Sequence, residues 1–167
     1  VLVKKLAQRK GPVFMRTGRP KAPLIYSEGT DFEIGKGVVL RTGSDVTIFA
    51  IGLLVFEALL AAESLSEKGV QAAVVDLHTI KPIDRNLVVS QAKETGAVVT
   101  CEEHQIYGGL GSIVSEVLAQ EFPVPIEFIA IRDTYAESGT PEELFERYGL
   151  TARHIVTACE RVISRKK

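Results

Sequence analysis

The chain has 167 residues, of which 46% are hydrophobic and 25% charged, and its formal net charge is −1. This composition is typical of a globular protein and excludes a disordered tail, a collagen-like repeat and a disulfide-stapled mini-protein. Residues 1–21 hold seven basic side chains and no acidic one, whereas residues 22–160 hold nine basic and 21 acidic ones. The sequence therefore predicts a basic opening segment on an acidic body.

The opening segment has the features of a domain end. Residues 1–9 are predicted to form the end of a helix, residues 13–15 a short buried strand, and residues 17–26, which are rich in proline and glycine, a linker. A helix with no cap in front of it is a poor start for a domain. We therefore expect this stretch to be the tail of a preceding domain, in a fragment or in one section of a split enzyme.

From residue 35 onward, strands and helices are predicted to alternate. The strands are expected at 38–40, 46–51, 70–77, 97–101 and 125–131, and the helices between them at 53–68, 85–95 and 112–122. Near-continuous apolar strands of this kind are typical of a parallel sheet that is covered by helices on both faces. The local pattern alone pairs the first strand with the second as a hairpin.

Three helix starts carry local cap residues. Asp84 is predicted to cap the helix at 85–95, which ends at Gly96. The sequence Thr140-Pro141-Glu142-Glu143 is a capping box that begins a helix ending near Gly149. Thr151 is predicted to cap the last helix, which runs to about residue 164.

The compartment is predicted from two absences in the sequence. Cys101 and Cys159 have neither metal-ligand spacing nor a C-x-x-C pattern, so buried reduced thiols are expected. The N-terminus lacks the apolar run of a secretory signal, and the least charged stretch, 46–65, is broken by glycine and glutamate. These features predict a cytoplasmic protein that is not inserted in a membrane.

Polar residues are expected at the carboxyl ends of the strands, where open parallel sheets bind their ligands. They occur at 76–79, 102–104 and 132–133, and a glycine-rich loop at 107–112 opens the next helix. Free N–H groups at that helix start could hold an anion, although a glycine turn of this kind is more often only a turn.

The Glu102-Glu103-His104 sequence invites a general acid/base or a metal-binding hypothesis. Adjacent residues of a strand point to opposite sides, however, so the two glutamates are not expected to share a proton or an ion. The histidines show no ligand spacing, and no metal site or Ser/His/Asp nucleophile motif is predicted. A polar contact of His104 at a domain or subunit interface is the preferred interpretation.

Arg16 and Arg19 bracket the end of the short strand predicted at 13–15 and the turn after it, in a segment without acidic residues. Because arginine binds phosphate in a bidentate manner, the two side chains form a candidate phosphate clamp. The alternative is a pair of solvated linker charges.

Taken together, four segments resemble the transketolase family and occur in its order: GPVFMRTGRP at 11–20, DLHTIKPID at 76–84, EHQIYGGLG at 103–111 and SGTPEELFERYGL at 138–150. The first resembles the last strand of the pyrimidine-binding domain and its exit, and the others resemble the C-terminal domain. The resemblance covers nearly the whole chain and is greatest to animal and split prokaryotic transketolases.

The resemblance implies a fold and a division into domains. The fold is a three-layer α/β/α domain of class α/β with a five-stranded mixed sheet, whose first strand is antiparallel and lies beside the third, not the second. Residues 1–21 would be the tail of the pyrimidine-binding domain, 22–34 a linker and 35–167 the transketolase C-terminal domain.

The resemblance also implies an activity, the transfer of a two-carbon ketol unit between sugar phosphates in the pentose phosphate pathway. Thiamine diphosphate and a divalent metal would serve the complete enzyme, with none bound by this fragment, which would hold no catalytic residue and be inactive alone. The implied partners are the N-terminal section of the enzyme and a second copy in a homodimer.

Particular residues follow from the same resemblance. Arg19 matches the arginine that binds the substrate phosphate, and Arg16 would support it. Glu103, His104 and the glycines of the loop would be interface or structural residues; the loop glycines are Gly108, Gly109 and Gly111.

Four alternatives remain open. Deoxyxylulose-phosphate synthase and the β subunits of 2-oxo-acid dehydrogenases share the domain. A free-standing regulatory domain could bind a small ligand in the strand-end crevice. A helix-turn-helix over 141–164 could bind DNA, but the net charge of −12 over residues 22–160 would repel a polyanion, so no nucleic-acid partner is expected.

Overall fold

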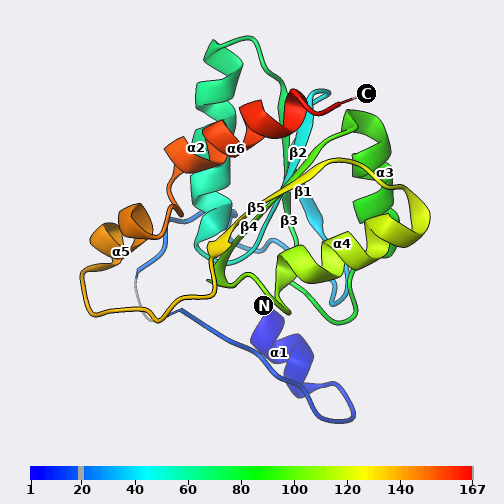
Figure 1. Ribbon diagram of the computed structural model, residues 1–167. Helices are drawn as coiled ribbons and strands as arrows, with labels where there is room; N and C mark the ends of the chain where they lie inside the picture. Colours follow the sequence, from blue (N-terminus) through cyan, green and yellow to red (C-terminus); the bar gives the residue numbers. More distant parts are fainter. Residues whose placement is uncertain (19–20, 167) are drawn as a thin grey trace.

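The structure, a computed structural model, describes residues 1–18 and 21–166. Its strands are β1 (Val38–Arg41), β2 (Val46–Ala50), β3 (Ala72–Asp76), β4 (Val98–Gln105) and β5 (Ile126–Ile131). Its helices are α1 (Leu2–Ala7), α2 (Leu54–Glu67), α3 (Arg85–Thr95), α4 (Leu110–Glu121), α5 (Pro141–Arg147) and α6 (Ala152–Ile163). Figure 1 shows the sheet at the centre of the molecule, with α1 standing apart from it.

The five strands form one mixed sheet in the order β1-β3-β2-β4-β5. β1 runs antiparallel to β3, and every other pair is parallel. The hairpin expected from the local pattern is therefore wrong, and the arrangement implied by the resemblance is confirmed. Both edges of β2 are taken by parallel neighbours, β3 and β4, so β1 cannot pair with it. The connection from β1 to β2 therefore passes over the end of β3. There Gly43 lies against the backbone of Ala72, which leaves no room for a side chain.

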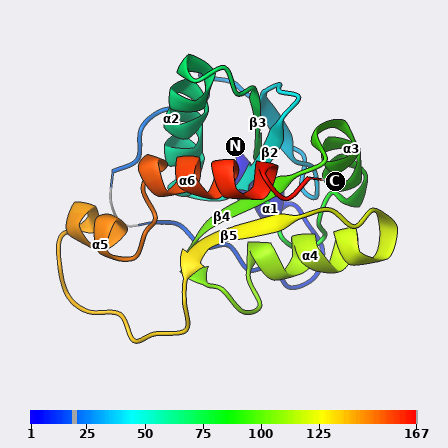
Figure 2. The same ribbon diagram turned by 45° about the horizontal axis from the view of Figure 1, so that its top comes forward.

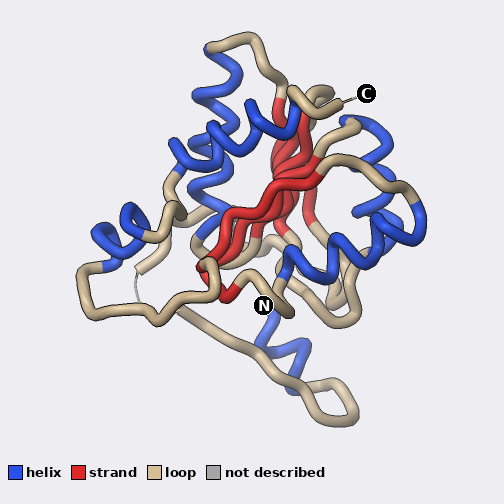
Figure 3. The backbone as a smooth tube through the Cα atoms, viewed as in Figure 1, coloured by secondary structure: helices blue, strands red, loops and turns tan. Residues whose placement is uncertain are grey.

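Helices cover both faces of the sheet and give the expected three layers (Figure 2). Ile48 and Val99 face α2 and α6, whereas Phe49 and Val98 face α3 and α4. The alternation follows from the two-residue period of a strand, and because both faces are covered, β2 and β3 are buried along their whole length. Figure 3 shows the strands running between the two pairs of helices.

Both cysteines lie in the core on the α2–α6 side, as expected, and are free thiols. Burial raises the pKa of Cys159 to about 12 and raises that of Cys101 well above its usual range. Neither thiol is therefore ionised at neutral pH, so neither can act as a nucleophile in the folded chain.

The helix caps are of two kinds. Asp84 caps α3 by accepting a hydrogen bond from the Leu87 N–H, and Thr140 forms the predicted capping box of α5 with Glu143. Thr151 stands at the N-cap of α6, but its side chain makes no cap hydrogen bond. The Glu57 carboxylate of α2 instead accepts a hydrogen bond of 2.6 Å from the backbone N–H of Ala152.

Helix α6 packs its apolar face against α2, β4 and β5, with Ile155, Cys159 and Val162 fully buried. Its arginines are engaged on the surface, since Arg153 pairs with Glu146 and Arg161 with Glu127. This pairing counts against the helix-turn-helix alternative, because arginines already paired with carboxylates are less able to neutralise DNA phosphates.

The opening segment differs from the prediction in one respect. Residues 2–7 form the expected helix α1, but residues 13–15 are not a strand and are not buried. The Phe14 side chain is 91% exposed, and Val13 and Met15 are also exposed. The apolar residues are those of a buried strand, but the described residues of this chain provide no neighbouring strand to pair with them.

No helix among the described residues has the length and apolar character needed to span a membrane.

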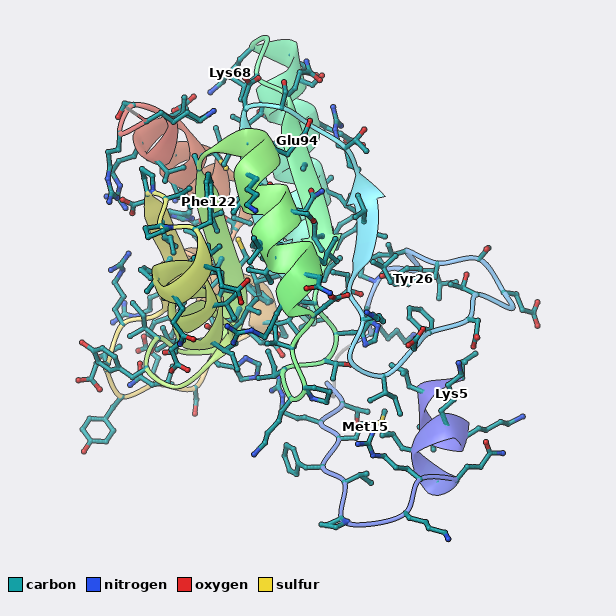
Figure 4. The ribbon with its side chains drawn as sticks, turned by 90° about the vertical axis from the view of Figure 1, so that its right-hand side faces the viewer. Lys5, Met15, Tyr26, Lys68, Glu94 and Phe122 are labelled. Carbon is teal, nitrogen blue, oxygen red and sulfur yellow. The ribbon has the colours of Figure 1, made fainter. Side chains whose placement is uncertain are left out.

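The linker is attached to the end of β3 through Tyr26. The Tyr26 hydroxyl donates a hydrogen bond of 2.6 Å to the Asp76 carboxylate, and the Phe32 ring lies edge-on to both Tyr26 and His78. Figure 4 shows Tyr26 beside the domain, close to β1. Burial raises the pKa of Asp76, although the hydrogen bond from Tyr26 and the nearby His78 act in the opposite direction.

We predict that Asp76→Asn stabilises the chain at neutral pH. The raised pKa means that ionising Asp76 costs folding free energy once the pH passes its unfolded-state pKa, whereas asparagine keeps an oxygen acceptor for Tyr26 without the charge. The gain in Tm over wild type should be larger at neutral pH than below the usual aspartate pKa. A larger gain at the acidic pH would contradict the prediction.

Candidate functional site

The candidate site lies where the chain leaves β2 and β4 in opposite directions. These strands are neighbours in the sheet, but β2 leads into α2 on one face and β4 leads into α4 on the other. Such a switch point opens a crevice at the carboxyl ends of the strands, where ligands of open α/β sheets bind. Two glutamates of β4 and the opening segment meet here.

Glu102 points toward α4 and is 1% exposed. Its two carboxylate oxygens accept hydrogen bonds of 2.8 Å from the backbone N–H groups of Leu110 and Gly111. A carboxylate at a helix N-terminus satisfies otherwise unpaired N–H groups and is stabilised by the helix dipole. The anion position predicted for the glycine-rich loop is therefore filled by a side chain of the protein itself.

The loop glycines allow this contact. A Cβ atom on Gly109 would overlap the Glu102 carboxylate, and one on Gly111 would lie 2.6 Å from the Phe128 ring. Gly108 adopts a positive φ of 82° and donates its N–H to the Ser112 hydroxyl. These contacts hold the loop against Glu102, Phe128 and Ser112.

The element bounds differ from the prediction at this point. β4 continues to Gln105 instead of ending at residue 101, because its ladder with β5 resumes after an irregularity and pairs Gln105 with Ile131. α4 begins at Leu110 instead of residue 112, because Glu102 caps the two additional N–H groups. Glu102, Glu103 and His104 are therefore strand residues and not loop residues.

Glu103 points to the side of the sheet opposite to Glu102, as the alternation of a strand requires. Its Oε1 lies 2.5 Å from a guanidinium nitrogen of Arg16. The Glu103 side chain is 15% exposed and that of Arg16 is 47% exposed. The structure thus brings Arg16 and Glu103 together, a contact that the sequence did not predict, whereas Arg19 lies outside the described residues.

His104 is partly exposed, and its Nδ1 lies 3.6 Å from a Glu102 oxygen. The distance is too long for a hydrogen bond. The two side chains are therefore not hydrogen-bonded to each other in this arrangement, and the Glu102 carboxylate is held by the backbone N–H groups instead.

Beside the Arg16–Glu103 ion pair lies an open groove of about 350 Å³. Residues 16–18 form one wall, and apolar side chains of α5 and its surroundings form the other. The apolar lining residues are Leu53, Ile131, Ala136, Pro141, Leu144, Phe145 and Leu150. Among the described residues that line the groove, Arg16 and Glu103 are the charged ones, and they neutralise each other.

The described residues do not fit a diphosphate–metal group. They contain no cluster of three histidine, cysteine, aspartate or glutamate side chains that could hold a metal ion. The helix N-terminus that could receive a phosphate already holds Glu102. We therefore assign no chemical step of a cofactor to these residues.

Two structural anchors are missed by reasoning from the sequence. The sequence pattern suggests an acid or ligand role for Glu102. The N-cap position of α4 is Gly109, which has no side chain to cap the helix, and this is the signal that a distant group does so. The pattern also places Tyr26 in a linker. An aromatic residue in a proline- and glycine-rich stretch is the signal that this part of the linker contacts the domain.

Comparison with known proteins gives one consistent family. The family described as "Transketolase, C-terminal domain" matches residues 35–155. A 6-deoxy-6-sulfo-D-fructose transketolase subunit of Clostridium sp. is 47% identical over 93% of this chain and 48% of its own length. An apulose-4-phosphate transketolase subunit of Phocaeicola vulgatus is 44% identical over 89% of this chain and 48% of its own length. The chain therefore spans about half the length of these relatives.

Solved structures agree with the sequence comparison. A structure described as a split gene transketolase, inactive β4 tetramer, matches 99% of this chain and 55% of its own chain, with a TM-score of 0.96 and 48% identity. A transketolase mutant from Pichia stipitis matches 78% of this chain and 18% of its own chain, with a TM-score of 0.60 at 18% identity, which supports the fold alone.

We predict that Glu102→Gln destabilises the chain by about 2–3 kcal/mol, because it removes a charge from the helix N-terminus and turns an amide N–H₂ toward a backbone N–H. The free energy of unfolding by urea measures this. Glu116→Gln, an exposed change on the same helix, is the matched control and should shift stability by less than about 0.5 kcal/mol. Equal losses for both variants would refute the cap.

Proposed function

Because the chain belongs to the transketolase family, whose C-terminal domain spans residues 35–155, we propose that it is the C-terminal section of a split transketolase. In this proposal it works with an N-terminal section to transfer a two-carbon ketol unit between sugar phosphates. The match to a split-gene transketolase over 99% of the chain is the observation that carries the proposal.

The division of the chain follows the same proposal. Residues 1–21 belong to a preceding pyrimidine-binding domain, residues 22–34 are the linker and residues 35–167 are the C-terminal domain. The exposed apolar side chains of Val13, Phe14 and Met15 support this division, because an exposed strand-like sequence of this kind is expected to be covered by neighbouring chain.

The family implies thiamine diphosphate in the complete enzyme. We propose that the cofactor and its divalent metal are bound by the other parts of the enzyme, so that this fragment binds neither and is inactive alone. The absence of a fitting site among the described residues supports this assignment. In the assembled enzyme the chain supports a homodimer and carries Arg19, which binds the substrate phosphate with the support of Arg16.

The groove beside Arg16 does not favour the alternative of a free-standing ligand-binding domain. Its lining is mostly apolar, and besides one neutralised ion pair it includes the hydroxyl-bearing Thr17 and Tyr148, so it offers few groups to orient a polar metabolite. The synthase alternative differs in chemistry rather than in fold. A synthase releases carbon dioxide from a 2-oxo acid donor, whereas a transketolase moves a ketol unit without it.

The first prediction of this proposal is complementation. The chain mixed with its N-terminal section, thiamine diphosphate and Mg²⁺ should transfer a ketol unit from a ketose phosphate to an aldose phosphate, and either section alone should not. Product formation followed by chromatography measures this. Ketol transfer by this chain alone would overturn the proposal, and carbon dioxide released from pyruvate would favour the synthase.

The second prediction concerns Arg19. In the assembled enzyme, Arg19→Ala should lower kcat/KM for phosphorylated acceptors by about 10- to 150-fold, which corresponds to the loss of roughly 1.5–3 kcal/mol from a charge-assisted phosphate contact. Unphosphorylated acceptors and cofactor affinity should be little changed. Lys21→Ala, a neighbouring basic residue, is the matched control. Equal losses with phosphorylated and unphosphorylated acceptors would contradict this role.

A further inference from the structure

The crevice between β2 and β4 is entered by the chain's own opening segment. Arg16, Thr17 and Gly18 line the same groove as Leu53, which follows β2, and Glu103 of β4. Gly52 lies beside Glu103 on this side, since a Cβ atom there would be in van der Waals contact with the Glu103 Oε1 at 3.8 Å, and its backbone adopts a positive φ of 65°. In open α/β sheets this crevice usually receives a ligand, and here a guanidinium group of the same chain lies in it.

The Glu103 side of the ion pair is less exposed to solvent than that of an ordinary surface pair. Glu103 is only 15% exposed, and Arg16 is its ion-pair partner in the described part of the chain. When a mostly buried carboxylate loses its partner, the cost of removing its charge from water is no longer offset. A fully exposed carboxylate has no such cost. The Arg16 guanidinium donates to the Glu103 carboxylate, so the contact is a hydrogen bond between two charged groups.

The contact joins the opening segment to the end of β4, whereas the ion pair of Lys5 joins that segment to Asp31 of the linker. Residues 12–18 are extended and belong to no helix or strand, and most of their side chains are exposed. Figure 4 shows Met15, one residue before Arg16, on the coil segment that connects to α1. Arg16 is therefore the point at which the opening segment is held against the strand ends.

We propose that Glu103 is a positioning residue, which holds the opening segment in the switch-point crevice through Arg16 and so sets where the preceding domain meets the C-terminal domain. The inference rests on the proposed function and deepens it. It gives Arg16 a role that acts through Glu103 instead of through direct contact with substrate phosphate.

The chain geometry links this anchor to substrate binding. Arg19 follows Arg16 by three residues, and three extended residues reach at most about 10 Å. We therefore expect loss of the Arg16 contact to weaken the phosphate contact proposed for Arg19, because a binding group on a chain that is already held loses less conformational entropy on binding. The effect should be on substrate binding and not on the chemical step.

The test is a double-mutant cycle in the assembled enzyme, with Glu103→Gln, Arg16→Gln and the combination. Each single variant should raise KM for a phosphorylated acceptor about three- to tenfold and leave kcat within about twofold. The double variant should be no worse than the poorer single variant, because both changes break one contact. Glu160→Gln, which breaks the exposed Lys68–Glu160 pair, is the matched control and should leave KM unchanged.

Effects that multiply in the double variant would overturn the proposal, as would an equal rise in KM for unphosphorylated acceptors. A second readout does not depend on activity. In the full chain alone, each single variant should lower Tm by roughly 2–6 °C, and the double variant by no more than the poorer single one. If the assembled wild-type enzyme transfers no ketol unit, the proposed function fails, while this Tm cycle still decides whether Glu103 anchors Arg16.

Discussion

The alternation of side chains along β4 is the constraint on which the strand-end region depends. Because successive residues of a strand point to opposite faces, Glu102 and Glu103 cannot serve the same site. Glu102 turns to α4 and caps it, and Glu103 turns to the other side and pairs with Arg16. One face of the strand end is thus closed by a buried carboxylate, and the other holds the opening segment.

This arrangement supports the proposal that a fold which commonly binds ligands has a supporting role here. The helix N-terminus that could take a phosphate is filled, the two thiols are buried and un-ionised, and the switch-point crevice contains Arg16. What the domain offers instead is a rigid platform. Two covered sheet faces hold β4 in place, and β4 in turn holds the segment that leads to the proposed phosphate arginine.

Much of the fold could be predicted because its determinants are local or periodic. The apolar runs marked all five strands, and Gly96 and Gly149 marked helix ends. The local pattern wrongly predicted a hairpin of β1 and β2. These strands are close in sequence, but β3 and β4 occupy the two edges of β2, so β3 separates β1 from β2. The pattern failed at residues 13–15 for a related reason, since a strand needs a neighbour as well as a sequence.

The sequence by itself determined the caps of α3 and α5, because Asp84 and Thr140 lie within a turn of the N–H groups that they bind. It also determined that Glu102 and Glu103 would diverge. Only the tertiary structure decided what each would meet. Glu57 caps α6 across 95 residues of sequence, and Arg16 reaches Glu103 across 87. Such contacts leave no local pattern in the sequence, because the packing of the sheet and its helices brings the partners together. A glutamate in the sequence is the same residue whether its carboxylate will contact solvent, a helix end or an arginine.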